Sequence, residues 1–159
     1  PCQTQLAEKI ICACKDIGVA AELRLVESGK IKKDIIKPRD YEALLFSVKA
    51  GPLPDPFQFW HSSQREWPGL NLSMFSNKEA DKILAEARLT AEEPERNKKY
   101  QEFNIIFNRE FPTVFLWAPR FIYLLPKEIS NVTMGQLSSS SDRFAQIEKW
   151  FIKQKRTWQ

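Results

Sequence analysis

His61-Ser62-Ser63 places the residue types of nucleophilic catalysis next to one another, and His61 is the single histidine of the 159-residue chain. A serine nucleophile needs a base within hydrogen-bonding reach, which adjacency in sequence does not provide. The chain also has no HExxH, GxSxG or glycine-rich phosphate motif. We therefore predict a protein with no catalytic residue and no cofactor. A small hydrolase using His61 is an alternative, and a hydrogen bond from His61 that fixes a neighbouring helix to a loop is the simpler role.

The three cysteines are too few and too poorly spaced for a metal centre or a disulfide framework. Cys12 and Cys14 lie two residues apart in a predicted helix, where each residue advances the chain by about 100°. Their side chains then project to nearly opposite sides. We predict no metal site and expect the two cysteines to be small buried hydrophobic residues.

The strongest candidate for a binding site is the exit from a predicted strand. Residues 41–48 form a near-continuous apolar run, which is typical of a strand buried on both faces of a sheet. Gly51, Pro52 and Pro54 then prevent the strand from continuing. Ligands of open α/β sheets bind where strands end, so we expect function at residues 49–54.

A short aromatic helix follows this turn. Asp55 has the residue type of an N-cap and Pro56 that of a first helical position, before Phe57, Phe59 and Trp60. Trp60 and Trp117 both lie near predicted strand exits. Their rings could pack on the side chains or backbone of a bound peptide, although packing in the core is the alternative.

Periodicity predicts the elements upstream of this site. An apolar face from Leu6 to Ile17 indicates a helix that ends at Gly18. Residues 19–26 alternate as a strand does, and a second helix beginning near Ser28 stops at Pro38. Helix, strand, helix and strand in this order predict parallel pairing with a right-handed crossover.

Two capping-box patterns mark the downstream helices. Residues 76–79 and 90–93 each begin a helix with an apolar stripe, and the second helix ends at Phe111-Pro112. We predict an antiparallel hairpin packed on the sheet. Residues 113–117 and 121–125 are β-rich runs, and a closing strand around residues 150–152 is favoured over a helix.

Composition narrows the function classes. The chain has 24 basic and 20 acidic residues, a net charge of +4, and no apolar run of the roughly 20 residues that a membrane span needs. Lysines cluster at residues 30–33 and in the tail at 153–156. A basic nucleic-acid-binding α/β domain is therefore a second alternative.

The order of these motifs resembles the family 5 extracellular solute-binding proteins, the oligopeptide- and dipeptide-binding receptors of bacterial ABC importers. The resemblance runs from about Ala7 to Trp158 and rests on Asp-Pro, FWHSS, Asn71-Leu72-Ser73, the helix opening NKEAD, Glu95-Arg96, Tyr100, Glu110-Phe111-Pro112 and Tyr123. It implies an α/β fold in which a mixed sheet is flanked by helices, as a partial lobe of a type II periplasmic-binding-protein fold. Residues 1–159 would form a single domain, the C-terminal lobe fragment of a larger solute-binding protein.

The resemblance also implies partners and a location. These are a peptide-like solute, the N-terminal lobe of the same protein and a membrane ABC permease, with no nucleic acid. The full-length protein would be periplasmic or extracellular, anchored to the membrane as a lipoprotein.

The resemblance gives one more expectation, about how the ligand is held. In peptide-binding members a carboxylate shortly before Asp-Pro holds the ligand's α-ammonium, but here Pro52 has that position and Lys49 replaces a usual tryptophan. The ligand is then expected to pair through its backbone near residues 47–51, or to place an anionic group opposite Lys49. The expected ligand-binding residues are Ser47, Lys49, Ala50, Gly51, Asp55, Trp60, His61 and Trp117.

Overall fold

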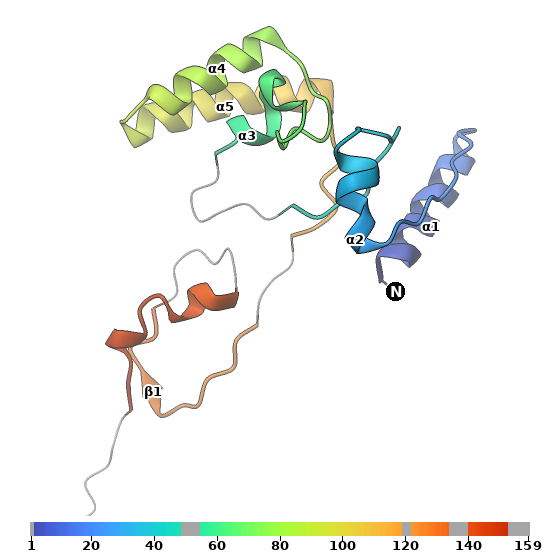
Figure 1. Ribbon diagram of the computed structural model, residues 1–159. Helices are drawn as coiled ribbons and strands as arrows, with labels where there is room; N and C mark the ends of the chain where they lie inside the picture. The colour runs from blue at the N-terminus through green and yellow to red at the C-terminus, as the bar shows by residue number, and fades with distance from the viewer. Residues whose placement is uncertain (1, 49–54, 119–121, 134–139, 153–159) are drawn as a thin grey trace, which may run out of the picture.

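The computed structural model describes residues 2–48, 55–118, 122–133 and 140–152. Figure 1 shows α3, α4 and α5 together in one body, with α1 and α2 to one side and a smaller unit that contains β1 further along the chain. The elements are α1 (Cys2–Asp16), α2 (Ser28–Ile31), the π-helical turn η1 (Lys32–Ile36), α3 (Phe57–Trp60), η2 (Ser62–Gln64), α4 (Lys78–Leu89), α5 (Glu93–Glu110), β1 (Ile129–Ser130), η3 (Ser140–Phe144), η4 (Ile147–Lys149) and β2 (Phe151–Ile152).

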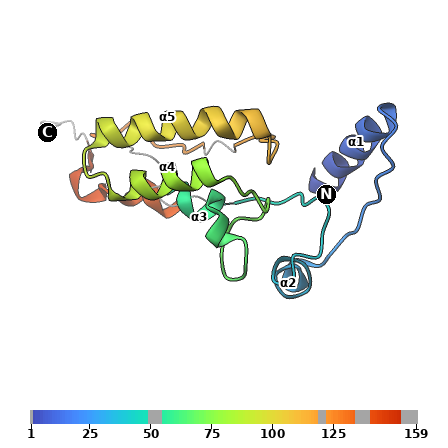
Figure 2. The ribbon, with the colours of Figure 1, turned by 90° about the horizontal axis from the view of Figure 1, so that it is seen from above.

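The best-formed part of the molecule is the hairpin of α4 and α5, whose axes run side by side in Figure 2. Asn77 begins α4, because its Oδ1 accepts the backbone N–H groups of Glu79 at 2.9 Å and Ala80 at 3.0 Å. The core between the helices consists of buried apolar residues: Ala80, Leu84 and Ala87 from α4, and Phe103, Ile106 and Phe107 from α5. The predicted hairpin and its apolar stripes are confirmed.

The predicted ends of these helices are correct to within two residues. The N-caps are Asn77 and Glu92, not the first residues of the two capping-box patterns. Phe111 ends α5 in the left-handed conformation with φ 48°, as the Phe-Pro pair predicted. Glu27 precedes the first residue of α2, so Ser28 is in the helix and not its cap.

Helix α1 is also confirmed, but its apolar face is largely uncovered. The chain leaves the helix at Gly18, whose φ is 80° and whose N–H donates to the Lys15 carbonyl at 3.0 Å. Ile17 is 77% exposed, and Cys12 is exposed whereas Cys14 is half-buried. The expectation that both cysteines are buried was therefore wrong for Cys12, which lies at an open depression on α1.

The predicted strands at residues 19–26, 41–48, 113–117 and 121–125 are not strands in the part of the chain that the structure describes. Residues 41–48 have no regular secondary structure and are mostly exposed, with Val48 at 55%, so the buried central strand was a wrong prediction. A strand needs a neighbour to bind its N–H and C=O groups, and no described segment lies beside these residues as a ladder partner. The predicted parallel crossover is absent from the described residues for the same reason.

The sheet that the described residues form is a two-stranded antiparallel ribbon, not the expected mixed sheet flanked by helices. Ile129 pairs with Ile152 and Ser130 with Phe151. The predicted closing strand around residues 150–152 is thereby confirmed. It adjoins a small aromatic cluster, in which the Arg143 guanidinium lies 5.0 Å from the Tyr123 ring centroid and 4.4 Å from that of Phe144.

The region before residue 49 is tied to the loop that follows α3. Arg39, in the left-handed region with φ 58°, donates from Nε to the Arg65 carbonyl and from Nη2 to the Gly69 carbonyl, both at 2.7 Å. Tyr41 Oη donates to the Leu72 carbonyl at 2.6 Å. The side chains of Ile35 and Ile36 are buried. These bonds join segments about 30 residues apart in the sequence.

Candidate functional site

Asp55 is fixed at the start of α3 by two protein partners. Its Oδ1 accepts the backbone N–H of Phe57 at 3.1 Å, as a capping side chain does, although α3 begins at Phe57 and Pro56 has the N-cap position that was predicted for Asp55. Its Oδ2 lies 2.9 Å from Nε of Arg88, near the end of α4. Both carboxylate oxygens are therefore engaged by the protein itself.

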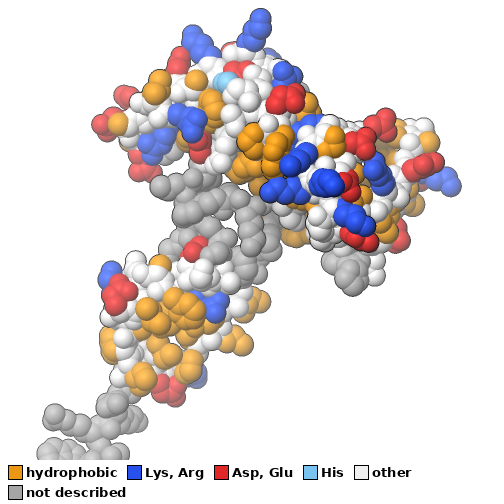
Figure 3. Space-filling model, viewed as in Figure 1, with side chains coloured by type: hydrophobic (Ala, Val, Ile, Leu, Met, Phe, Trp, Pro, Cys, Tyr) orange, Lys and Arg blue, Asp and Glu red, His pale blue; other side chains and the backbone are white. Residues whose placement is uncertain are grey.

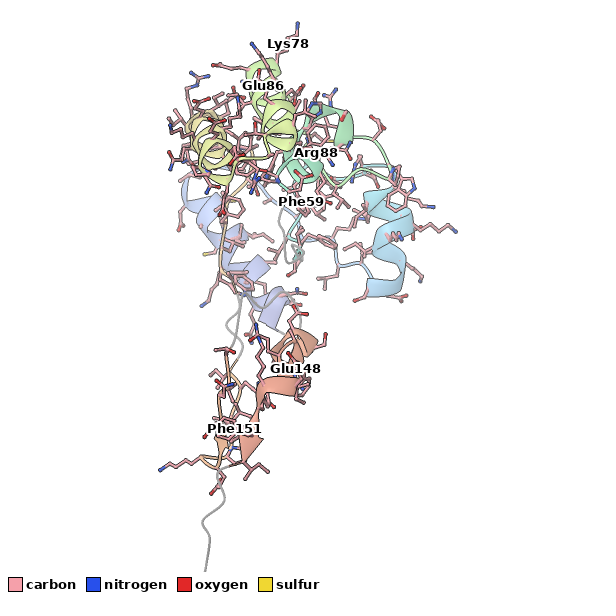
Figure 4. All side chains as sticks on the ribbon, turned by 90° about the vertical axis from the view of Figure 1, so that its left-hand side faces the viewer. Phe59, Lys78, Glu86, Arg88, Glu148 and Phe151 are labelled. Carbon is pink, nitrogen blue, oxygen red and sulfur yellow. The ribbon has the colours of Figure 1, made fainter. Side chains whose placement is uncertain are left out.

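Arg88 continues this contact into a stack of side chains. Its guanidinium lies 4.3 Å from the centroid of the Phe57 ring, and the Phe57 ring stacks on the His61 ring at 4.0 Å with 22° between the planes. Figure 4 shows Arg88 on α4 above α3, the helix that carries Phe59. A cation on a ring face is electrostatically favourable, so the stack joins α3 to α4.

His61 does not form a catalytic triad with its neighbours. Its Nδ1 accepts the Ser63 backbone N–H at 3.1 Å and lies 2.8 Å from Ser63 Oγ. The Asp81 carboxylate, 4.0 Å from His61 Nδ1, accepts instead from the backbone N and Oγ of Ser62 at 2.8 and 2.5 Å. In a triad the carboxylate binds one imidazole nitrogen and the serine hydroxyl the other. Here both groups cap the turn of η2, which agrees with the predicted role of His61 in fixing the aromatic helix to a loop.

Asn71 is the residue on which the loop between α3 and α4 closes, and it is completely buried. Its Nδ2 donates to the carbonyls of His61 at 3.1 Å and Phe75 at 2.9 Å, while its Oδ1 accepts the Phe75 N–H at 3.2 Å. Sequence reasoning gave Asn71 no structural role. Its place in the Asn-Leu-Ser motif, two residues after Gly69, was the available signal for an Asn side chain that satisfies turn backbone.

The two tryptophans expected at the ligand lie in different surroundings. Trp60 packs against the α4–α5 core, with its ring edge-on to Phe107 at 4.5 Å and to Phe115 at 6.2 Å. Trp117 is 57% exposed and lies with Leu6, Lys9 and Cys12 around an open depression on α1 of about 580 Å³. The structure thus places one ring in the core and the other on α1.

The remaining expected ligand residues are near residue 49. Ser47 is exposed in the extended segment before it. Lys49, Ala50 and Gly51 lie outside the described residues. Of the eight residues expected at the ligand, the structure therefore brings Asp55, Trp60 and His61 together around α3 and its neighbour α4.

The negative charge of Asp55 also affects a phenol on α5, that of Tyr100. Burial raises the pKa of the Tyr100 phenol, and the negative charge of nearby Asp55 raises it further. Among the described residues, no group of three or more His, Cys, Asp or Glu side chains could hold a metal ion. The described helices also include none with the length and apolar character of a membrane span. The polar side chains around α3, among them Asp55, His61 and Asp81, hold its backbone and aromatic rings in place.

Comparison with known proteins shows what the chain as a whole is similar to. No family model matches the chain. It is 25% identical over 139 residues to the oligopeptide-binding protein AppA of Bacillus subtilis (strain 168), which is 87% of this chain and 25% of the relative. The structure of AppA from Bacillus subtilis in complex with a nonapeptide matches with a TM-score of 0.71 at 22% identity, over 96% of this chain and 29% of the other.

These similarities confirm the resemblance to the family 5 solute-binding proteins that the motif order predicted. The chain spans about a quarter of the length of the relative it matches. The structural match supports a shared fold, and the helix-rich body with a small two-stranded sheet is compatible with part of an α/β protein.

Proposed function

We propose that this chain is a non-catalytic, ligand-capturing part of the substrate-binding protein of an ABC importer that takes up peptides or related solutes. The observation that carries the proposal is the similarity over 139 residues to an oligopeptide-binding protein. The geometry around α3 supports it, because Asp55, His61 and Asp81 are all used to position helices and turns. Binding followed by lobe closure needs such rigid positioning and no reacting group.

The finer architecture that we propose is a partial C-terminal lobe of a type II periplasmic-binding-protein fold. Residues 19–26 and 41–48 have no regular secondary structure and carry exposed apolar side chains, including Leu25 at 70% and Val48 at 55%. Such segments become strands when a neighbouring strand binds their backbone groups. We propose that the other regions of a protein of AppA's length, including its N-terminal lobe, supply those neighbours.

The proposed setting is outside the cytoplasmic membrane, in the periplasm or the extracellular space. There the full-length receptor, anchored as a lipoprotein, would deliver its solute to a membrane ABC permease. The solute would be held in the cleft between lobes, where water is excluded and polar contacts are strengthened.

The ligand is proposed to be recognised without an ammonium-binding carboxylate at Asp55. Both oxygens of Asp55 already have partners, Phe57 N and Arg88 Nε. Pro52 has no carboxylate to offer, and Lys49 would repel an α-ammonium. Backbone pairing near residues 47–51, or an anionic ligand group opposite Lys49, is the mode that these residues favour.

Calorimetry on the full-length receptor tests this function with a peptide library in free and N-acetylated forms. We expect binding, and an affinity that N-acetylation changes by less than about threefold, since no charge-assisted bond to the ammonium is lost. Strict dependence on a free amine would refute the recognition mode. The absence of any peptide binding would refute the function.

The geometry favours neither alternative. A hydrolase would require Asp81 or another carboxylate to orient His61, whereas Asp81 binds Ser62. We therefore expect no hydrolytic activity in an esterase and peptidase assay, either in the parent or in His61→Ala. For the nucleic-acid alternative, the candidate phosphate-binding residues in the described part of the chain are the lysines at residues 30–33. One of them, Lys32, lies over the ring of Trp67.

A further inference from the structure

Four exposed lysines of α2, η1 and the residue after it include two that contact one exposed tryptophan. We call this surface the lysine–tryptophan face and define it as Lys30, Lys32, Lys33, Lys37 and Trp67. The four lysines are exposed, and Trp67 is 38% exposed. In Figure 3 blue side chains gather over α2 beside hydrophobic ones. The face includes the lysine cluster that the sequence singled out and that the proposed function leaves without a role.

Two of these lysines contact the tryptophan ring. The Nζ atoms of Lys32 and Lys37 lie 5.1 and 5.2 Å from the Trp67 ring centroid. This is within the range of a cation–π interaction, and the aliphatic part of each lysine can cover the ring while the ammonium stays in water. Positive charges are thereby held at the border of an aromatic surface.

The scaffold beneath the face is fixed. Ile35 and Ile36 anchor η1 with buried side chains. The loop that carries Trp67 is held by the two hydrogen bonds from Arg39 to the carbonyls of Arg65 and Gly69. Gly69 admits no side chain, because a Cβ there would lie 2.2 Å from the Gln64 carbonyl oxygen. The relative positions of Trp67 and the lysines are thus set by both segments.

The face has an excess of positive charge. Residues 27–37 contain four lysines and the two acids Glu27 and Asp34, which leaves a net charge of +2. Glu27 pairs with Lys30 at 2.9 Å. Lys32, Lys33 and Lys37 have no carboxylate within 4.0 Å among the described residues. Leu70, in the same loop as Trp67, is 43% exposed and adds apolar surface to that loop.

We propose that the lysine–tryptophan face docks on an anionic membrane surface. In this arrangement the exposed edge of Trp67 and the side chain of Leu70 sit at the headgroup level, where tryptophan is favoured, and the lysine ammoniums bind lipid phosphates. Single-stranded nucleic acid fits less well, since it needs an open aromatic face for base stacking and the lysines already lie over the Trp67 ring. This proposal is independent of peptide capture and does not require it.

Vesicle sedimentation with the full chain tests the proposal. The probes are vesicles of phosphatidylcholine alone and of phosphatidylcholine with phosphatidylglycerol. We expect at least tenfold tighter binding to the anionic vesicles, weakened by added salt. Because each lysine near such a surface contributes about fivefold, K32E/K33E/K37E is expected to reduce binding at least tenfold and Trp67→Ala severalfold.

The matched control reverses three exposed lysines elsewhere, as K78E/K82E/K98E on α4 and α5. It changes the net charge equally and is expected to weaken binding by less than about threefold. Circular dichroism checks that each variant is folded, and K32Q/K33Q/K37Q replaces the first variant if it is not. Equal binding to both vesicle types, equal loss in the control, or tighter binding to single-stranded RNA that the face variant abolishes would each overturn the proposal. Peptide calorimetry gives an independent readout of the proposed function.

Discussion

Nε of Arg88 lies 2.9 Å from Oδ2 of Asp55, and this ion pair connects the last turn of α4 to the residue two positions before α3. The other oxygen of Asp55 accepts the Phe57 N–H, and Phe57 in turn lies under the Arg88 guanidinium. One carboxylate and one guanidinium thus set both the start and the orientation of a four-residue helix. A helix this short is not stable by itself and depends on such contacts.

Replacing Asp55 separates its two roles. Asp55→Ala removes the cap, which is worth about 1 kcal/mol, and the partly exposed ion pair, which is worth up to about 1 kcal/mol. Asp55→Asn keeps an oxygen for the Phe57 N–H and is expected to lose about half as much. Urea unfolding followed by circular dichroism measures both. An equal loss in the two variants would mean that the cap contributes nothing.

Leu84 should dominate the stability of the helical hairpin. It is fully buried between α4 and α5, so Leu84→Ala is expected to lower the free energy of unfolding by about 2–5 kcal/mol. Leu89→Ala is the matched control, since Leu89 is on the same helix and 88% exposed. We expect a change within about 0.5 kcal/mol there. Similar effects in both variants would contradict the packing described for α4.

Asn71→Ala should open the loop between α3 and α4. The change removes the donor to the Phe75 carbonyl and leaves the Phe75 N–H with the 3.4 Å bond to Ser73 Oγ, at a cost of about 1–3 kcal/mol for a group left unsatisfied. The amide proton of Phe75 is then expected to exchange with solvent at least tenfold faster, as NMR would measure. Asn104→Ala, at an exposed position of α5, is the control and should leave that amide unchanged.

The ion pair between α4 and α5 should give the hairpin a defined pH dependence. Lys99 Nζ lies 2.6 Å from Glu86 Oε2, and this hydrogen bond lowers the pKa of Glu86 below its ordinary 4.5 and raises that of Lys99 above its ordinary 10.5. The pair therefore stabilises the fold above pH 4.5 and below pH 10.5. Its contribution fades as the pH falls through the lowered pKa of Glu86 or rises through the raised pKa of Lys99.

Glu86→Gln tests this dependence. The variant is expected to be less stable than the parent at pH 7 and closer to it in stability at pH 3, because protonation of Glu86 as the pH falls removes the charge that pairs with Lys99. Thermal unfolding at the two pH values measures the difference. Glu8→Gln on α1, where the carboxylate is exposed, is the control. A difference between Glu86→Gln and the parent that persists unchanged at pH 3 would show that the charge has no part in it.

The parts of the fold that sequence reasoning predicted correctly depend on local contacts. Gly18 and the Phe111-Pro112 pair act on backbone groups within a few residues, so their types locate the ends of α1 and α5, and the cap of α4, Asn77, lies one residue after the start of the predicted capping box. The apolar stripe of α4 similarly needs one partner helix, which follows it in the chain. The site residue Asp55 was located at a helix start for the same reason.

The parts that were predicted wrongly depend on distant partners. Residues 41–48 have the composition of a buried strand, but burial and pairing require a sheet that the described residues do not form. The binding role of Trp117 stays a prediction. Its position beside α1 depends on the path of residues 113–118, which no local sequence pattern specifies. The role of Asn71 was missed because the fold of the loop brings it next to His61 and Phe75. No periodic pattern in the sequence predicts these partners.

Position 39 is subject to two opposing requirements. Its left-handed backbone would be most easily adopted by glycine or asparagine, while the carbonyls of Arg65 and Gly69 need the forked donor of an arginine. An engineer who optimised backbone preference alone would introduce glycine here and detach the loop from η1. Arg39 therefore holds the loop in place despite its unfavourable backbone conformation. Selection for these two hydrogen bonds would oppose the replacement of Arg39 by a residue that adopts the left-handed conformation more easily.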